Sequence, residues 1–284
     1  MNYFKLKQYF VNQLLNVYDV REIEQIFFLV LEDLYQISKT DYILKKQELV
    51  DDDVILRFDK ILSQLKANKP IQYILKYAYC FERKFKVNQN VLIPRQETES
   101  LIELIQKTHQ SPKVNLLDIG TGTGCIPIIL KIQNPEFQVS AIDISKEALK
   151  LAEKNAEQYS VEIKLFQKDI LNPKQWLDFE NSSFDIIVSN PPYVLNSEKI
   201  KMHNNVLDYE PKQALFVNDD NPLVFYTAII EFALQKLKKG GQIYFEINEA
   251  FGEEISNLLR NSKFKNVKIV KDLHQKNRFV HGKK

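Results

Sequence analysis

Val114-Asn115-Leu116-Leu117-Asp118-Ile119-Gly120-Thr121-Gly122-Thr123-Gly124 is the stretch that decides the fold. An apolar run ends at a turn with glycine at every second position, and a second apolar run, residues 125–130, follows it. This pattern predicts a strand, a glycine turn and a helix. Glycines let the backbone pass close to a ligand without a Cβ in the way, and the start of a helix presents free N–H groups. We therefore expect a nucleotide-like ligand at Gly120, Thr121, Gly122, Thr123 and Gly124.

The spacing of the glycines narrows the class of ligand. The dinucleotide fingerprint is G-x-G-x-x-G, which places a pyrophosphate at the helix N-terminus. This chain has G-x-G-x-G at residues 120–124. The difference favours a cofactor without a pyrophosphate, and S-adenosylmethionine is the obvious candidate. The alternative is a tight turn with a purely structural role.

Acidic residues follow the next two predicted strands. Asp143 can accept hydrogen bonds from ribose hydroxyls, as acids do at this place in nucleotide-binding folds. The alternative is that Asp143 or Ser145 caps the helix predicted for residues 146–158. Further on, Asp169 and Ile170 offer an acceptor and an apolar side chain to an adenine, although a loop aspartate is often only solvated. We assign Asp143, Asp169 and Ile170 to the cofactor.

A strand predicted over residues 184–188 runs into Asn190, Pro191, Pro192 and Tyr193. Two successive prolines end the strand and fix the direction of the backbone. The Asn190 side-chain oxygen and the Pro191 carbonyl can then accept both hydrogens of one amino group, and the Tyr193 ring can stack on a planar amide or base. These four residues are the candidate catalytic group for transfer onto a planar nitrogen, and Asn190 also borders the cofactor. The alternative is an ordinary proline-rich turn with a capping Asn.

The four candidate segments all follow predicted strands, and ligands of open α/β sheets bind at the carboxyl ends of the strands. The fold class we expect is α/β, with a largely parallel sheet covered by helices on both faces. Its seven strands are expected to begin near residues 114, 138, 161, 184, 241, 266 and 278.

The N-terminal part has a different pattern. Apolar residues recur every three or four positions in three segments of residues 4–66, which predicts three helices. Alternating residues at 71–93, with Asn88-Gln89-Asn90 between two apolar runs, predict a β-hairpin. We therefore divide the chain into helices at 1–69, a hairpin linker at 70–95 and a catalytic domain at 96–284. Residues 194–221 are polar and long for a loop, and are a candidate substrate-facing lid.

Composition fits a cytoplasmic globular enzyme. The 284 residues carry a net charge of +2, so stable binding to nucleic acid, which requires a larger basic excess, is disfavoured. Cys80 and Cys125 have no spacing typical of a metal site or disulfide framework, and we expect no metal. We find neither a membrane-spanning apolar stretch nor a secretory signal.

With these motifs in place, the chain resembles the release factor glutamine methyltransferases, the PrmC or HemK family. The resemblance runs from about residue 70 to the C-terminus. It rests on Gly120 to Gly124, Asp143, Asn190 to Tyr193, and on the segments 69–74, 91–95, 97–99, 209–211, 240–241 and 245–247. Departures from the family pattern stand at Lys76 and Glu82, near positions where glycine is expected, and at Gln96, Asn248 and Asn277.

The resemblance implies a Rossmann-like class I S-adenosylmethionine-dependent methyltransferase with a small N-terminal helical domain. It also implies the substrate, which is the side-chain amide nitrogen (N5) of the glutamine in the Gly-Gly-Gln motif of class I peptide chain release factors. The N-terminal helices would then dock the release factor, and we expect the enzyme to be a monomer.

Two other functions remain open. An adenine N6 methyltransferase could use the same Asn-Pro-Pro-Tyr turn on a base flipped from its stack. A cofactor-sensing binding module would keep the cofactor residues without turnover.

Overall fold

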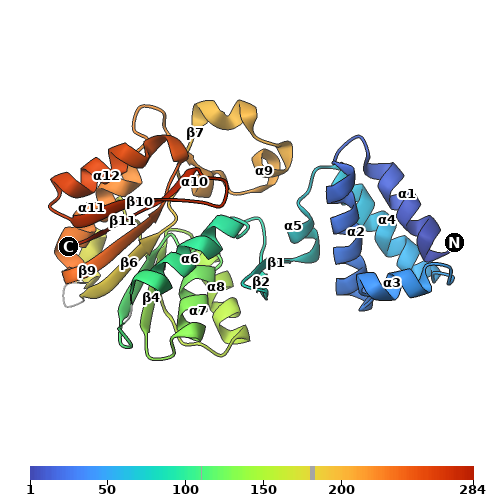
Figure 1. Ribbon diagram of the computed structural model, residues 1–284, viewed down its shortest axis with the longest axis horizontal. Coiled ribbons are helices and arrows are strands. Elements are labelled where there is room, and N and C mark those ends of the chain that lie inside the picture. Colours follow the sequence, from blue (N-terminus) through green and yellow to red (C-terminus); the bar gives the residue numbers. More distant parts are fainter. Residues whose placement is uncertain (110, 180–182) are drawn as a thin grey trace. The chain divides into compact units, whose positions relative to one another are not determined.

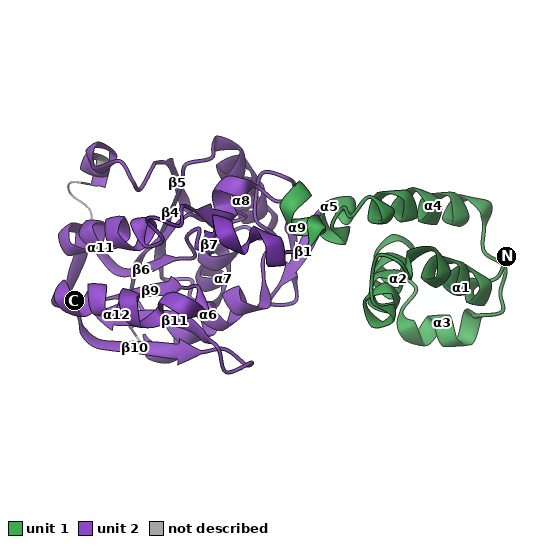
Figure 2. Ribbon diagram, turned by 90° about the horizontal axis from the view of Figure 1, so that it is seen from above, with its two compact units in different colours: residues 1–75, 203–209 green, residues 76–202, 210–284 purple. Residues whose placement is uncertain are grey.

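The computed structural model describes residues 1–109, 111–179 and 183–284 (Figure 1). These residues form two compact units, coloured separately in Figure 2. Unit 1 consists of Met1–Leu75 and His203–Tyr209, and unit 2 of Lys76–Met202 and Glu210–Lys284. The chain therefore leaves unit 2 after residue 202 and returns to it at residue 210.

Unit 1 is helical. Its helices are α1 (Tyr3–Leu14), α2 (Val20–Tyr35), α3 (Lys39–Lys45), α4 (Asp52–Lys66), α5 (Ile71–Leu75) and α9 (Asn204–Tyr209). The ring centroids of Phe10, Phe27 and Phe58 lie within 5.6 Å of one another, so α1, α2 and α4 pack together through these rings. These are the three helices that the apolar periodicity predicts, whereas the short α3 and α5 were not predicted. In α9, the Tyr209 hydroxyl donates to the carbonyl of Ala67 at 2.8 Å.

Unit 2 is built on a seven-stranded sheet, which confirms the predicted fold class. In spatial order its strands are β10 (Lys265–Lys271), β11 (Asn277–Lys283), β9 (Leu237–Glu246), β6 (Phe184–Ser189), β3 (Asn115–Ile119), β4 (Gln138–Asp143) and β5 (Lys164–Gln167). The five strands from β9 to β5 are parallel, and β11 runs antiparallel to both its neighbours. Strand β5 begins at 164 instead of 161, and β9 begins at 237, earlier than expected.

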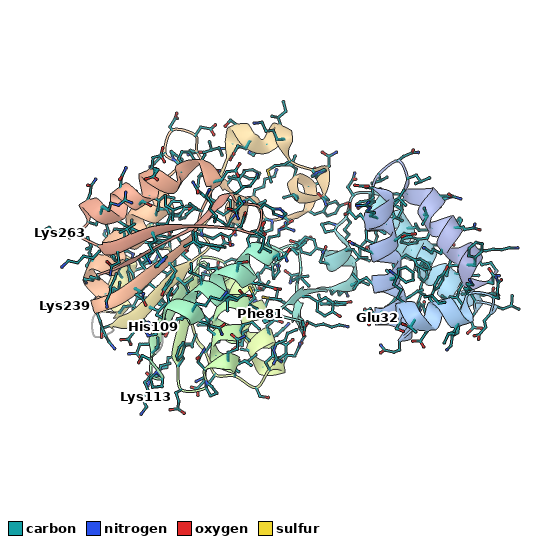
Figure 3. The ribbon with its side chains drawn as sticks, in the orientation of Figure 1. Glu32, Phe81, His109, Lys113, Lys239 and Lys263 are labelled. Carbon is teal, nitrogen blue, oxygen red and sulfur yellow. The ribbon has the colours of Figure 1, made fainter. Side chains whose placement is uncertain are left out.

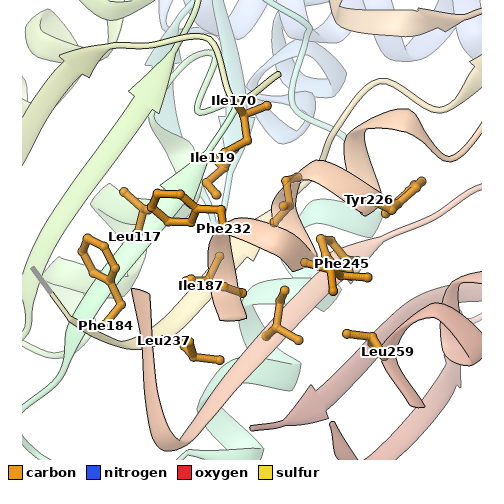
Figure 4. Packing of buried hydrophobic residues seen from close by; sticks show 14 of the residues in the cluster. Leu117, Ile119, Ile170, Phe184, Ile187, Tyr226, Phe232, Leu237, Phe245 and Leu259 are labelled. Carbon is orange, nitrogen blue, oxygen red and sulfur yellow. The ribbon is translucent and has the colours of Figure 1, made fainter. Parts of the chain in front are cut away.

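Helices cover both faces of this sheet because its central strands are apolar on both sides. Leu116 faces the layer of α6 (Gln96–Thr108), α7 (Cys125–Gln133) and α8 (Lys146–Gln158). Leu117, its neighbour in β3, faces α11 (Val224–Lys236), α12 (Gly252–Asn261) and the 3₁₀ helix η1 (Pro173–Phe179). Figure 4 shows this second cluster, in which Phe184, Ile187 and Phe232 meet between β6 and α11.

The β-hairpin is present, but its predicted turn was wrong. Strands β1 (Tyr77–Cys80) and β2 (Arg83–Lys86) pair with Cys80 opposite Arg83, so the turn is Phe81-Glu82, and 88–90 lies outside the strands. Phe81 is labelled in Figure 3. Both turn residues have positive φ, 49° and 58°, which is unusual without glycine. The Glu99 carboxylate accepts a hydrogen bond from the Phe81 N–H at 2.9 Å and holds this turn.

The segment expected to be a long loop is folded. It contains β7 (Val194–Leu195), η2 (Asn196–Lys201), α9, α10 (Lys212–Leu215) and β8 (Phe216–Val217). β7 and β8 pair in parallel, so the two ends of the segment are joined. A further 3₁₀ helix, η3 (Glu249–Phe251), follows β9. None of the described helices is long and apolar enough to cross a membrane.

Candidate functional site

A cavity of about 250 Å³ opens at the carboxyl ends of the parallel strands. β3 is paired with β4 on one side and with β6 on the other, so the order of the strands reverses between β3 and β6. Such a reversal leaves a crevice in which α/β proteins bind ligands. The sequence-predicted residues that line the cavity are Gly120, Thr121, Gly122, Thr123, Asp143, Asp169, Ile170, Asn190, Pro191 and Pro192. Gly124 and Tyr193, by contrast, do not line it.

The glycine turn is held by the neighbouring strand. The N–H groups of Gly120 and Thr121 both donate to the Ile142 carbonyl, at 2.9 and 3.1 Å. Gly122 has a φ of +55°, and a Cβ built on it would meet nothing within 4 Å, because it borders the open cavity. A Cβ on Gly124 would lie 3.0 Å from that of Ala152, so this glycine lets α7 pack closely on α8.

Asp143 ties the turn to the end of β4. One carboxylate oxygen accepts from the Gly122 N–H at 2.9 Å, and the other accepts from the Ser145 N–H at 2.8 Å. Burial raises the pKa of this carboxyl, and these backbone hydrogen bonds oppose the rise. The cap of α8 is Ser145, whose hydroxyl accepts from the Ala148 N–H. Ser145 is therefore the residue whose side chain caps α8, and Asp143 lines the cavity.

Asp169 and Ile170 form the wall beyond β5. The Asp169 carboxylate accepts from the Leu171 N–H at 2.9 Å, which closes a local turn. Ile170 is buried, and its carbonyl accepts from the Trp176 indole N–H at 3.1 Å. The wall therefore has a fixed apolar surface beside an acidic group.

The Asn-Pro-Pro-Tyr turn lies against the glycine turn. The Ser189 hydroxyl donates to the Ile119 carbonyl at 2.7 Å and so joins the ends of β6 and β3. The Asn190 side chain is half-buried and has no hydrogen-bond partner in the described ranges of the chain. The Tyr193 hydroxyl donates to the Glu246 carboxylate at 3.0 Å, and Tyr193 is not among the residues that line the cavity.

Two buried acids near the cavity were not assigned a role from the sequence. Asp118, one residue before the cavity wall, is fully buried, and burial raises the pKa of its carboxyl to about 7. Neither of its oxygens meets hydrogen-bond geometry with any residue that the structure describes, although Thr121 is near enough to oppose the rise in pKa. Glu246 is the other acid, and burial also raises its pKa to about 7. Each is a single acid inside an otherwise apolar run, a pattern that marks the residue as unusual but does not by itself show that it is buried.

Two segments distant in the sequence close one side of the cavity. Pro94 lies on one of them, and Gln213 and Ala214 on the other. Glu210, buried, accepts a hydrogen bond from the Ile93 N–H at 3.2 Å and forms an ion pair with Arg95. This acid therefore fixes the two segments to each other.

Comparison with known proteins agrees with this architecture. The family model for the methyltransferase small domain matches residues 96–215, and the model for the PrmC N-terminal domain matches residues 10–75. A release factor glutamine methyltransferase of Flavobacterium psychrophilum is 44% identical over 95% of this chain and 95% of its own length. The chain belongs to the release factor glutamine methyltransferase family.

Membership in this family confirms the resemblance on which the sequence analysis ended, and it makes the chain a methyltransferase. The release factor glutamine methyltransferase of Bacteroides thetaiotaomicron is 38% identical over 97% of this chain and 98% of its own. Among solved structures, the hMettl16 catalytic domain in complex with the MAT2A 3′UTR hairpin 6 aligns with a TM-score of 0.55 at 15% identity. That alignment covers 82% of this chain and 81% of the other, and it shows a shared fold.

Proposed function

We propose that the protein methylates the side-chain amide nitrogen, N5, of the glutamine in the Gly-Gly-Gln motif of class I peptide chain release factors, with S-adenosylmethionine as the methyl donor. The names of its relatives support the release factor glutamine as substrate. The observation that carries the proposal is the half-buried Asn190 amide, without a partner among the described residues, beside Pro191 at the cavity.

The residues around the cavity fit S-adenosylmethionine. The Asp118 carboxylate is buried without a hydrogen-bond partner among the described residues, and a cationic amino acid group of the cofactor would compensate its charge. Gly122 leaves open space for the cofactor to approach the backbone, and Asp143 would accept from the ribose. Asp169 and Ile170 would hold the adenine. Once bound, the cofactor supplies an electrophilic methyl group on a sulfonium.

The protein's own part in the reaction is to orient a weak nucleophile. The lone pair of an amide nitrogen is delocalised into its carbonyl, so it must be held in place for attack. The Asn190 side-chain oxygen and the Pro191 carbonyl would accept the two N–H hydrogens of the substrate amide. Orientation of this kind can lower a barrier by about 7 kcal/mol or more. The accepting oxygens also stabilise positive charge that develops on the nitrogen.

The domain roles belong to the same proposal. Residues 1–69 would dock another part of the release factor, and residues 70–95 would link this helical domain to the catalytic domain. Residues 96–284 would perform the methyl transfer. The family model at 10–75 supports a distinct N-terminal module. The enzyme would act as a cytoplasmic monomer on a protein, without stable binding to nucleic acid.

Mass spectrometry of the Gly-Gly-Gln peptide tests the substrate. A purified release factor is incubated with the protein and S-adenosylmethionine, and we expect a single added methyl group on the glutamine. Asn190→Ala should keep cofactor binding largely intact and give no methylated peptide. Asn134→Ala is the matched control, because its amide donates to the Leu130 carbonyl at the end of α7, outside the cavity.

Other outcomes would identify another function. Transfer of labelled methyl to nuclease-sensitive material would indicate an exocyclic amine of a nucleic acid base. Cofactor binding without transfer to protein or nucleic acid would indicate a binding module. Near-normal turnover by Asn190→Ala would contradict the role given to that residue.

A further inference from the structure

Glu246 is the last residue of β9, and its side chain is almost completely buried, at 1% exposure. One carboxylate oxygen accepts from the Tyr193 hydroxyl at 3.0 Å, and the other from the Thr98 hydroxyl at 3.3 Å. The backbone carbonyl of Glu246 accepts from the Tyr226 hydroxyl at 3.0 Å. The residue is therefore held by side chains from three other parts of unit 2.

The two hydroxyls on this carboxylate come from segments far apart in the sequence, α6 and the turn after β6. Thr98 lines the cavity from the first turn of α6. Tyr193 follows directly on Asn190, Pro191 and Pro192, which line it from the end of β6. The carboxylate thus connects the turn that would hold the substrate amide to the first turn of α6.

The charge state of Glu246 matters for this connection. Burial raises the pKa of its carboxyl to about 7, while the hydrogen bond from Tyr193, the positive charge of Arg278 and the hydrogen bond from Thr98 oppose the rise. Glu97 adds a like charge that raises it further. When ionised, the carboxylate accepts from both hydroxyls. When protonated, one of its oxygens carries a hydrogen and becomes a donor.

We propose that Glu246 is a positioning residue for methyl transfer, which holds the Asn190-Pro191-Pro192 turn in place through the Tyr193 hydroxyl and anchors that turn to α6 through Thr98. The proposal rests on the proposed function, because the turn matters only if it holds the acceptor amide. Glu246 does not line the cavity and would act only through the residues that it holds, Tyr193 and Thr98.

Kinetics of two Glu246 variants separate positioning from simple stability. Glu246→Ala removes both acceptors, and a misplaced amide holder should lower kcat by about 10²-fold with little change in the KM for S-adenosylmethionine. Glu246→Gln keeps an acceptor for Tyr193 and should retain kcat within about tenfold. Because Gln does not titrate, the contribution of Glu246 to the dependence of kcat on pH near 7 should be lost in Glu246→Gln, while Asp118, whose pKa is also raised to about 7, still titrates.

The matched control removes a similar contact between the same two elements. The Thr108 hydroxyl lies 2.7 Å from that of Tyr244, so α6 and β9 share a second hydroxyl contact, and neither residue lines the cavity. Thr108→Val should leave kcat and its pH profile unchanged. Thr98→Val, the same substitution at the other end of α6, should lower kcat.

Hydrogen exchange at the amides of Asn190, Tyr193 and Val194 reports the opening of the turn without any substrate, since Pro191 and Pro192 have no N–H. Exchange there should be faster in Glu246→Ala and unchanged in Thr108→Val. If Glu246→Ala does not fold, Tyr193→Phe provides the same comparison, because it removes only the hydroxyl.

The outcomes distinguish the two proposals. A natural protein that does not methylate a release factor refutes the proposed function, and hydrogen exchange still decides whether Glu246 holds the turn. A natural protein that methylates while Glu246→Ala or Tyr193→Phe keeps normal kcat and exchange refutes the positioning role.

Discussion

Lys76 and Glu82 adopt left-handed backbone conformations, with φ of 66° and 58°. Both stand near positions where related sequences are expected to have glycine, and a side chain in a left-handed backbone conformation costs about 1–2 kcal/mol. Replacing Glu82 with Gly relieves this cost. Glycine also gives the unfolded chain more conformational freedom, which lowers the free energy of unfolding by about 0.5–1 kcal/mol. We expect Glu82→Gly to raise the free energy of unfolding by about 0.5–1 kcal/mol, measured by urea denaturation.

The control for this prediction is Lys86→Gly on the same hairpin. Lys86 is exposed in β2, and its φ is not positive, so glycine brings only added freedom to the unfolded chain. Stability should fall there. A loss of stability in Glu82→Gly of the same size as in Lys86→Gly would contradict the strain at the turn.

Asp143 supports the glycine turn through the Gly122 N–H and α8 through the Ser145 N–H. We expect Asp143→Ala to weaken the binding of S-adenosylmethionine by about 10-fold or more, because a charged acceptor of backbone hydrogen bonds is lost. Isothermal titration calorimetry measures this affinity.

Asp185 offers a matched control at the opposite end of the sheet, because it also accepts from a backbone N–H, that of Asn115, at 2.8 Å. Asp185→Ala should lower stability without changing the affinity for the cofactor. Equal affinities for Asp143→Ala and the natural protein would refute the ribose role.

Single residues were predicted from the sequence where a motif marks them. Gly122 and Asn190 stand in motifs that predict a site, and the structure brings both to one cavity. Asp118 and Glu246 lie inside apolar strands, where the residue type alone does not tell a buried acid from one at the surface. Their burial depends on which helices cover the sheet, and this information is not local in the sequence.

Among the elements, long and strongly patterned segments were predicted well. The seven strands of the sheet and helices α1, α2 and α4 follow from apolar periodicity. The hairpin turn was misplaced because Asn88-Gln89-Asn90 has typical turn residues and Phe81-Glu82 does not. The hydrogen bond from the Phe81 N–H to the Glu99 carboxylate stabilises that turn. Glu99 lies 18 positions further along the chain, so short-range sequence patterns do not reveal this contact.

The segments closing one side of the cavity depend on the buried Glu210 and its partner Arg95. Arg95→Leu leaves a buried carboxylate without its cation, and we expect the free energy of unfolding to fall by about 2 kcal/mol. Urea denaturation measures this loss. Arg57→Leu, which breaks an exposed ion pair with Asp53 in α4, should change stability by less than about 1 kcal/mol. Equal effects of the two variants would show that Glu210 does not depend on Arg95.

For the molecule as a whole, Asp118 and Glu246 predict how stability depends on pH. Burial raises both pKa values to about 7, above the ordinary values of 3.8 and 4.5. At a pH between the ordinary pKa and about 7, each carboxyl is protonated in the folded chain and ionised in the unfolded chain. The free energy of unfolding therefore falls as the pH rises towards 7. Over the full range from the ordinary to the raised pKa, each group contributes on the order of 3–4 kcal/mol to this fall.

Urea denaturation of the cofactor-free protein at about pH 5.5 and about pH 7.5 measures how steeply the free energy of unfolding changes with pH. Asp118→Asn removes one of the two titrating groups, so its stability should depend less on pH than that of the natural protein. An unchanged slope in this variant would show that Asp118 does not retain its proton on folding.

The parallel pair β7 and β8 joins the two ends of the segment from which α9 leaves for unit 1. The helical unit is therefore completed by seven residues, His203–Tyr209, which the gene encodes more than 100 codons after the rest of it. One cut in the chain cannot separate the two units intact. Recombination that replaced only the first 75 residues would combine the helices of one protein with the α9 of another. Because these helices and α9 form one unit, we expect them to be inherited together.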